Sequence, residues 1–211
     1  MYLTRVEINV NNRQKYRELG HVGAIHSWVE RCFPEEFTQG VRSRKLWRVD
    51  TLNKKEYLLV LSESEPDSQV LTEYGVVGSA KTLDYTKMLD TLKEGQECQF
   101  RVVLTPTVRL SQRVDTTRAR EVACVTEDQQ LDYLHKRAER NGFSLDTNQV
   151  SIVKKGFVRY GKKGQREMDL IQVAYEGRLV IIDLEKFKHT LTEGMGRKRA
   201  YGFGLMTVIP V

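Results

Sequence analysis

The sequence is poor in cysteine: it has three, scattered at positions 32, 98 and 124. No two of them have the short spacing of a zinc knuckle, and an odd, widely separated set does not form a disulfide framework. We therefore expect neither a structural zinc site nor a disulfide-stapled secreted fold, and no metal or other cofactor. A reducing compartment, the cytoplasm, fits this cysteine usage best.

Long hydrophobic runs are also missing. No stretch reaches the roughly 18 uninterrupted apolar residues of a membrane-spanning helix, and residues 1–7 lack the apolar region of a signal peptide. No GxxxxGK[ST] motif is present, which excludes a nucleotide-hydrolysing P-loop. The sequence thus predicts a protein with no membrane partner and no P-loop chemistry.

The sequence does contain enough apolar material for a core and an excess of basic charge. Of its 211 residues, 40% are hydrophobic, and 34 Lys and Arg against 28 Asp and Glu give a net charge of +6. An excess of this kind favours a polyanionic partner, although the position of the charge matters more than its total. The length suits one large domain or two domains of about 100 residues each.

The first part of the chain has the order of a ferredoxin-like domain. Alternation over residues 2–10 predicts a half-buried strand, and residues 21–33, ended by Pro34, predict a helix. The order β-α-β-β-α-β is that of ferredoxin-like and RRM-like domains. The remaining predicted elements are strands at 45–50 and 56–61, a short helix after the turn at 65–68, and a strand at 79–85.

After a linker at residues 93–96 the same order begins again. We therefore predict an α+β protein of two tandem ferredoxin-like domains, residues 1–93 and 97–211. The second set consists of a strand at 98–109 broken or bulged at Pro106, a helix at 126–141, strands at 150–160 and 166–175 with sheet continuing over 178–182, a helix at 183–193 and a strand at 203–209.

Positive charge is concentrated in two stretches of the second half. Residues 154–166 hold six Lys or Arg around a glycine-containing turn, which suits either a hairpin in a groove of duplex RNA or a sheet edge kept charged against aggregation. Residues 194–205 combine four glycines with three consecutive cations, which suits either phosphate binding or a solvated turn. The helix at 126–141 adds a weaker cluster. The candidate RNA-binding residues are Lys154, Lys155, Arg159, Lys162, Lys163, Arg166, Arg197, Lys198, Arg199, Arg137 and Arg140.

Among the four histidines, His26 is the candidate catalytic residue. RNA cleavage without a metal requires one proton to leave the 2′-hydroxyl, another to reach the 5′-oxygen, and stabilisation of charge on the phosphate, and histidine titrates near neutral pH. His26 lies at the edge of the apolar stripe of its helix, where packing can brace an imidazole that still meets a substrate. A structural role is the alternative. His21 lies in the first turn, and His135 and His189 lie in charged helices.

Several segments together resemble the CasE (Cse-type) CRISPR-associated endoribonucleases of type I-E systems. The resemblance runs from end to end, and its most specific part is the glycine-rich loop near the C-terminus together with the opening strand. The segments are Met1–Val6, Ile25-His26 in a helix closed by Phe33-Pro34, residues 90–96 leading into 100–106, and Gly194–Met206.

This resemblance implies tandem ferredoxin-like domains and cleavage of precursor CRISPR RNA at the base of each repeat stem-loop. It further implies a metal-independent reaction that leaves 5′-hydroxyl and cyclic or 3′-phosphate ends, and an enzyme that stays on its product as a subunit of the Cascade complex. The catalytic histidine of the family falls on His26. Its basic groove-binding hairpin falls on residues 154–166, and its phosphate-contacting helix on the segment around Arg137 and Arg140.

One position departs from the family pattern. The family carries a tyrosine three residues before the catalytic histidine, where this chain has Gly23. A phenol that positions the substrate or transfers a proton must be absent here or come from elsewhere, with His21, Tyr16 and Lys15 as nearby candidates. Two rival hypotheses stay open: a non-catalytic RNA-hairpin-binding subunit of the same kind of complex, and a protein-interaction module with a basic surface.

Overall fold

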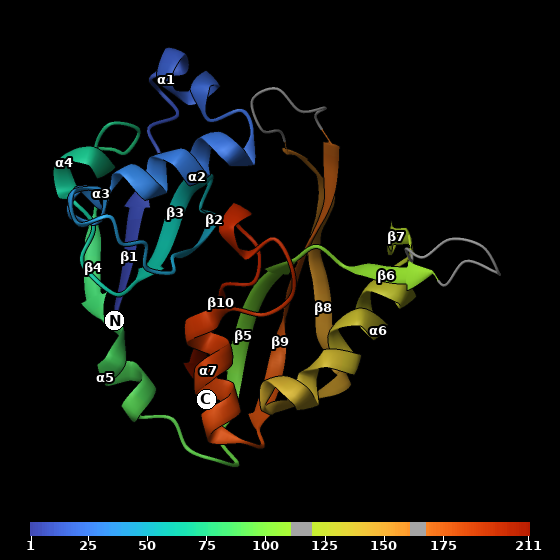
Figure 1. Cartoon of the computed structure of the whole chain (residues 1–211). Helices are drawn as coiled ribbons and strands as arrows, with labels where there is room; N and C mark the ends of the chain where they lie inside the picture. Colours follow the sequence, from blue (N-terminus) through green and yellow to red (C-terminus); the bar gives the residue numbers. More distant parts are fainter. Residues whose placement is uncertain (111–119, 161–167) are drawn as a thin grey trace.

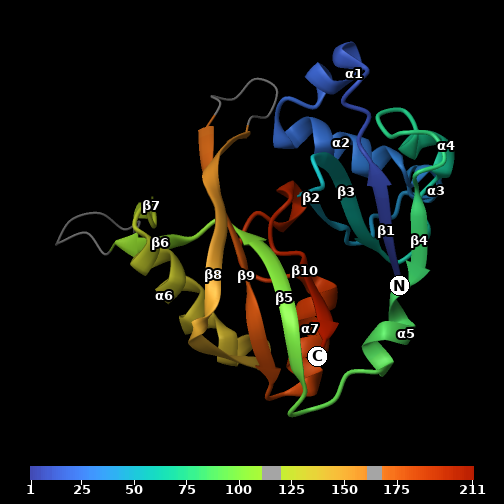
Figure 2. The same cartoon turned by 180° about the vertical axis from the view of Figure 1, so that it is seen from behind.

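The computed structural model describes residues 1–110, 120–160 and 168–211. The chain forms two four-stranded sheets, and the longer helices lie on one side of them (Figure 1). In the view from behind, the strands of both sheets lie in front of those helices (Figure 2). The molecule therefore has a helical side and a sheet side.

The first half of the chain supplies β1 (Tyr2–Glu7), α2 (Val22–Arg31), β2 (Leu46–Leu52), β3 (Lys55–Ser62), α4 (Ser68–Leu71) and β4 (Lys81–Asp84). The strand order in the sheet is β2-β3-β1-β4, and every neighbouring pair is antiparallel. Because α2 joins β1 to β2 and α4 joins β3 to β4, the predicted β-α-β-β-α-β order is confirmed.

The second half supplies β5 (Glu97–Leu104), α6 (Glu127–Ala138), β8 (Phe143–Tyr160), β9 (Met168–Ile181), α7 (Leu184–Glu193) and β10 (Met206–Pro210). The order β10-β5-β9-β8 is the order of the first sheet written from its other edge. The predicted α+β fold of two ferredoxin-like units is therefore confirmed. All strands of the first sheet lie between residues 2 and 84, and those of the second between 97 and 210. The boundaries 1–93 and 97–211 stay a prediction.

Several short elements were not predicted. Pro34 does follow the end of α2, but it also starts a new helix, because proline is tolerated at the first helical position. The predicted break at Pro106 in the strand at 98–109 is confirmed: β5 ends at Leu104, and a separate hairpin begins after Pro106. The elements that were not predicted are α1 (Arg13–Glu18), α3 (Pro34–Gln39), α5 (Tyr85–Asp90), β7 (Arg120–Ala123) and η2 (Arg199–Tyr201). β6 (Thr107–Leu110) and η1 (Glu139–Asn141) are the ends of the stretches predicted as strand at 98–109 and helix at 126–141.

Side chains at the helix starts explain where the longer helices begin. Thr126 and Gln129 form a capping box at α6, and the Asp183 carboxylate accepts from the backbone of Lys186 at the start of α7. At α2 the cap is His21, whose Nδ1 accepts from the Ala24 backbone N–H at 3.1 Å. This structural use of His21 was not predicted.

The two domains share core and polar contacts. Leu46 and Tyr85 from the first half pack in the same buried cluster as Phe143 and Phe187 from the second. Arg48 of β2 reaches across the junction, donating to the carbonyls of Arg101 at 3.0 Å and Leu205 at 2.9 Å and to Thr207 Oγ1 at 2.9 Å. Its charge is paired with Asp50 at 2.7 Å. The relative placement of the domains is thus determined by a buried, fully engaged guanidinium as well as by apolar packing.

Candidate functional site

His26 lies in the middle of α2, and the packing of its neighbours determines where it points. Trp28 and Val29 are fully buried, and the Trp28 indole donates to the Val70 carbonyl at 3.1 Å. These contacts hold one face of α2 against the sheet and α4. His26 lies at the edge of that face with 29% of its side chain exposed, the position that the helical pattern predicted.

Glu30 stands one helical turn after His26. Its Oε1 lies 4.0 Å from His26 Nδ1, and its Oε2 lies 3.9 Å from Nζ of the buried Lys45. Lys45 is itself held 2.5 Å from Glu36 Oε2. The carboxylate beside the imidazole therefore lies within ion-pair distance of a buried cation, whose shorter contact is with Glu36. The i,i+4 spacing of His26 and Glu30 is a signal that the sequence already carries.

A loop from the second domain covers the other side of His26. Tyr201, the last residue of η2, places its ring centroid 5.2 Å from that of His26, tilted by 54°. Tyr160, at the end of β8, meets Tyr201 edge-on at 4.6 Å, and Lys198 Nζ stands 4.5 Å above the Tyr160 ring. The rings of Tyr201 and Tyr160 thus lie in succession between His26 and Lys198, and the fold brings all four side chains into one region. Neither tyrosine was predicted, because the contact joins opposite ends of the chain.

The loop that carries Tyr201 is anchored on the first domain. The Trp47 indole of β2 donates to the Ala200 carbonyl at 2.9 Å. Gly202 has φ = +85°, and a Cβ there would lie 2.7 Å from the Trp47 ring, so a side chain at this position is opposed by both conformation and space. Arg199 donates to the carbonyls of Glu193 and Gly194 at the end of α7, at 2.8 and 3.2 Å. Of the three consecutive cations, Arg199 thus holds the loop together.

The electrostatic state of Tyr201 follows from its surroundings. A side-chain hydrogen bond with Tyr160, together with burial, raises the pKa of Tyr201 to about 12. The phenol therefore keeps its proton at neutral pH and acts as a hydrogen-bond donor or acceptor, not as a charged base.

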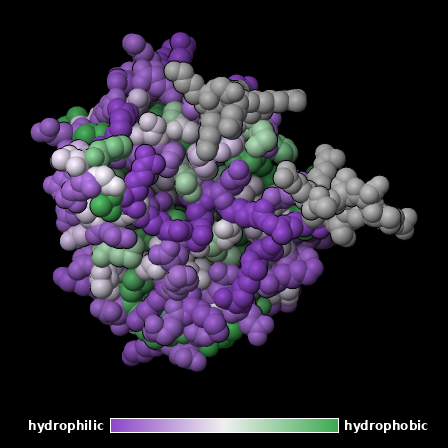
Figure 3. All heavy atoms as spheres, viewed as in Figure 1, coloured by the Kyte–Doolittle hydropathy of each residue, from purple (hydrophilic) through white to green (hydrophobic). Residues whose placement is uncertain are grey.

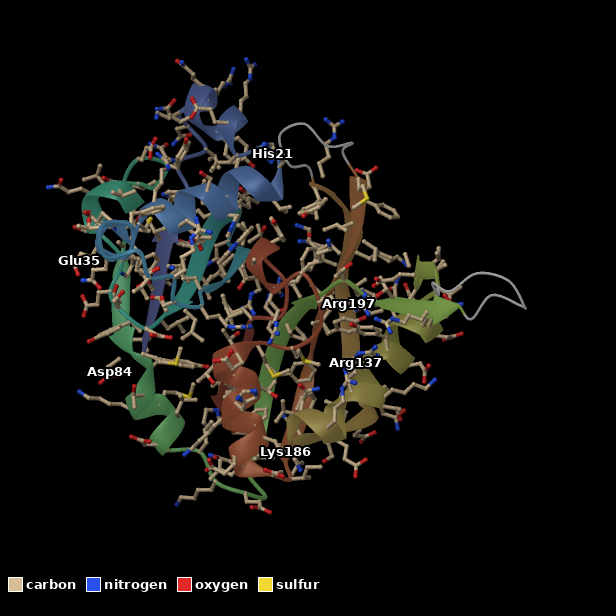
Figure 4. All side chains as sticks on the ribbon, in the orientation of Figure 1. His21, Glu35, Asp84, Arg137, Lys186 and Arg197 are labelled. Atoms are coloured by element: carbon tan, nitrogen blue, oxygen red, sulfur yellow. The ribbon has the colours of Figure 1, made fainter. Side chains whose placement is uncertain are left out.

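Three predicted arginines gather at the other end of the loop, and we call Arg137, Arg140 and Arg197 the arginine cluster. Arg137 lies over the Tyr133 ring at 3.5 Å and donates to the Tyr133 carbonyl at 3.0 Å. Burial raises the pKa of Tyr133, whereas the positive charges of all three arginines act to lower it. The three guanidinium groups therefore lie close enough to this one phenol to interact with it electrostatically. Arg197 also pairs with Glu121 of β7. Arg137 and Arg197 lie near each other on the helical side (Figure 4).

The basic residues of β8 do not share one face of the sheet. Lys155 is opposite Val173, on the face covered by α6, and its Nζ lies 2.6 Å from Glu127 of that helix. Arg159 has the same parity as Lys155, whereas Lys154 is opposite Ala174 and points to the other face. The stretch therefore divides its charge between two surfaces. Lys162, Lys163 and Arg166 lie outside the described residues.

Hydrophilic side chains extend across the middle of the helical side, between the two domains and over α6 (Figure 3). Among the described residues, no cluster of three or more His, Cys, Asp or Glu has an arrangement that could hold a metal ion. No helix in the described part of the chain has both the length and the apolar character needed to cross a bilayer. Cys32, Cys98 and Cys124 are all buried and unpaired with one another.

Known proteins similar to this chain agree with the resemblance seen in the sequence. The family model described as CRISPR associated protein matches residues 1–210. The CRISPR-associated endoribonuclease Cse3 of Thermus thermophilus is 31% identical over 221 residues, covering 100% of both chains.

Solved structures extend the likeness to three dimensions. Thermus thermophilus Cse3, bound to an RNA representing a pre-cleavage complex, matches with a TM-score of 0.79 and 28% identity, covering 99% of this chain and 98% of that one. A chain of a CRISPR RNA-guided surveillance complex in a pre-nicking state shares the fold, with a TM-score of 0.69, 21% identity and 100% of both chains covered. This chain belongs to the CRISPR-associated protein family, and within it to the Cse3 (CasE) type.

Proposed function

We propose that this protein is an endoribonuclease that cleaves precursor CRISPR RNA at the base of the repeat stem-loop. The 2′-hydroxyl attacks the adjacent phosphate without help from a metal ion, leaving a 5′-hydroxyl and a cyclic or 3′-phosphate. The enzyme then stays on the mature RNA as a subunit of Cascade, in the cytoplasm. Its membership of the Cse3 type over the whole chain supports this proposal.

His26 is the residue that makes a proton transfer in this reaction. The observation that carries the assignment is its position: a partly exposed imidazole that lies between Glu30 and the ring of Tyr201, at the junction of the two domains. The neighbouring Lys198 supplies positive charge near the same place. An imidazole held in this way can take or give a proton at neutral pH.

RNA binding falls mainly to the second domain. The arginine cluster and Lys198 lie along one glycine-rich loop, the adjacent helix α6 and the η1 turn that follows it, on the helical side that also presents His26. Guanidinium groups suit phosphate oxygens because their fork geometry allows two parallel hydrogen bonds. Lys155 and Arg159 on the α6 face of β8 extend this surface, and the stem contributes shape and backbone contacts more than base sequence.

Incubation with the cognate repeat RNA in EDTA tests the function directly. The native protein is expected to make a single cut at the base of the stem. His26→Ala should slow that cut by about 10²–10⁴-fold, since a positioned general acid or base is worth that much, while RNA binding stays within a few-fold. The matched control is His189→Ala, which removes an exposed histidine of α7 and should leave the rate unchanged.

Other outcomes separate the rival hypotheses. RNA that is bound tightly but stays intact under every condition would favour a non-catalytic hairpin-binding subunit. Binding that is only non-specific and is abolished by modest salt would favour a protein-interaction module. Cleavage that disappears in EDTA and returns with a divalent cation would contradict the metal-independent reaction.

A further inference from the structure

His26 has a neighbour whose chemistry suits the same reaction. Tyr201 lies ring to ring with His26 at 5.2 Å and with Tyr160 at 4.6 Å, so the imidazole and two phenols form one row. Lys198 continues the row, with its Nζ 4.5 Å from the Tyr160 ring. Three of these four side chains come from the second domain, and they complete a site that α2 alone does not form.

The structure holds Tyr201 firmly in this place. The residue before it is tied to the first domain by the 2.9 Å hydrogen bond from Trp47 to the Ala200 carbonyl. The residue after it, Gly202, lies directly against the Trp47 ring. Tyr160, only 8% exposed, supports the Tyr201 ring from behind. A side chain with anchors on both sides can present a hydroxyl with little loss of conformational entropy, as a catalytic group requires.

Other phenols and cations near α2 are engaged elsewhere. The Tyr16 hydroxyl donates to Glu56 at 3.0 Å, and Lys15 Nζ pairs with Glu73 at 3.3 Å. Gly23, one turn before His26 on the same helix, carries no side chain at all. Tyr201 is therefore the phenol that the fold does bring to His26.

The protonation of Tyr201 decides what it can do. Because the hydrogen bond with Tyr160 and burial raise its pKa to about 12, it is neutral across the physiological range and cannot remove a proton from the 2′-hydroxyl. The two phenols share one hydrogen bond, which leaves the pair one more proton to donate. The hydrogen bond raises the pKa of Tyr201 because the Tyr201 hydroxyl donates it to Tyr160, which favours the protonated phenol. A phosphate oxygen is a charged and stronger acceptor than a phenol, so it can take over this hydrogen bond, and Tyr160 can then donate its own proton to Tyr201.

We propose that Tyr201 is a second catalytic residue, whose hydroxyl, supported by Tyr160, donates a hydrogen bond to a non-bridging oxygen of the phosphate cleaved beside His26. In the reaction the 2′-oxygen forms a bond to phosphorus and the bond from phosphorus to the 5′-oxygen breaks. One proton leaves the 2′-hydroxyl and one reaches the 5′-oxygen; His26 makes one of these transfers and solvent the other. Tyr201 keeps its proton and stabilises the charge on the phosphate.

This inference rests on the proposed cleavage by His26, and its test is a single-turnover rate measured with protein in saturating excess over repeat RNA. Tyr201→Phe keeps the ring against His26 and removes only the hydroxyl. We expect it to cleave about 10²-fold more slowly than the native protein, the usual loss for one donor to a developing oxyanion, with an unchanged Kd for the RNA. Tyr16→Phe is the matched control, because it removes a hydroxyl bonded to Glu56, and it should cleave at the native rate.

A sulfur substitution distinguishes a direct contact from a merely structural role. Each non-bridging oxygen of the scissile phosphate is replaced in turn by sulfur, a poor hydrogen-bond acceptor. One of the two diastereomers should slow the native protein more than it slows Tyr201→Phe, because the variant has already lost that hydrogen bond. Both proteins should keep the same pH dependence between pH 5 and 9, since a phenol with a pKa of about 12 does not titrate there.

The outcomes separate the two proposals. If His26→Ala abolishes cleavage while Tyr201→Phe cleaves at the native rate, the role of Tyr201 is refuted and that of His26 stands. Equal slowing of native protein and Tyr201→Phe by both sulfur diastereomers refutes the direct contact as well. If the native protein does not cleave, or His26→Ala cleaves normally, both proposals fall.

Discussion

The two domains have the same strand order but contribute differently to the site. The first places His26 on a helix that is packed from both sides, with Glu30 and Lys45 behind it. The second contributes the arginine cluster, the basic residues of β8 and the loop that ends against His26. A ferredoxin-like fold does not specify a function by itself. Here the function comes from the junction, where a proton-transfer group of one domain meets the phosphate-binding groups of the other.

The largest expected effect comes from breaking the junction itself. Arg48→Ala should lower the free energy of unfolding by about 3–5 kcal/mol, because it removes one of the two arginines that pair with Asp50 and the donor to two buried carbonyls. Urea denaturation followed by circular dichroism measures this. Arg178→Ala, which removes the exposed pair with Glu97, should cost under about 1 kcal/mol. Similar losses for the two variants would contradict a junction held by Arg48.

The next effect comes from displacing the loop while leaving both domains folded. Gly202→Ala adds a Cβ at positive φ and against the Trp47 ring, and should cost about 2–4 kcal/mol from strain and overpacking. Because Tyr201 is its neighbour, cleavage should slow as well.

Gly95→Ala is the matched control for this substitution. Gly95 also has positive φ, +78°, but a Cβ there meets nothing within 4 Å. It should show the strain alone, about 1–2 kcal/mol, and native cleavage. Equal effects of Gly202→Ala and Gly95→Ala on stability and on rate would show that contact with Trp47 does not position the loop.

The smallest expected effect sharpens the role of the second domain. Arg140→Ala should weaken RNA binding and reduce the slope of log K against log salt by about 1, since one phosphate contact is lost. Filter binding over a series of salt concentrations measures the slope. Lys186→Ala, which removes an exposed cation of α7 paired with Asp183, should leave the slope unchanged. An unchanged slope for Arg140→Ala would remove it from the interface.

Local patterns were sufficient to predict both domains, because a strand or a long helix shows its period within a few residues. Strand alternation and the apolar stripe of α2 predicted the order of elements and the edge position of His26. The six-residue helices α1, α3 and α5 were missed, since a helix of under two turns shows almost no period. Pro34 was understood as an end only, although it also begins a helix.

The sequence alone could not predict the contacts that complete the site, because they join residues that lie far apart in the chain. Tyr201 lies beside His26 only because Trp47 draws the glycine-rich loop onto the first domain. Arg199 belonged to a predicted RNA-binding run but holds the end of α7, and Lys154 and Lys155 turned out to face opposite sides of the sheet. Composition indicated that these residues are basic, whereas tertiary packing decides which of them point to a ligand.

We assign proton transfer to His26 of the first domain and RNA binding mainly to the second domain. The most direct test of this assignment is to measure two quantities for two variants: the Kd for repeat RNA and the single-turnover rate at saturating protein. His26→Ala should lose about 10²–10⁴-fold in rate and keep its Kd. The double variant Arg137→Ala/Arg140→Ala should lose affinity and cleave at close to the native rate once the RNA is fully bound. If His26→Ala binds as poorly as the arginine variant, or the arginine variant stays slow at saturation, binding and cleavage are not divided between the two domains.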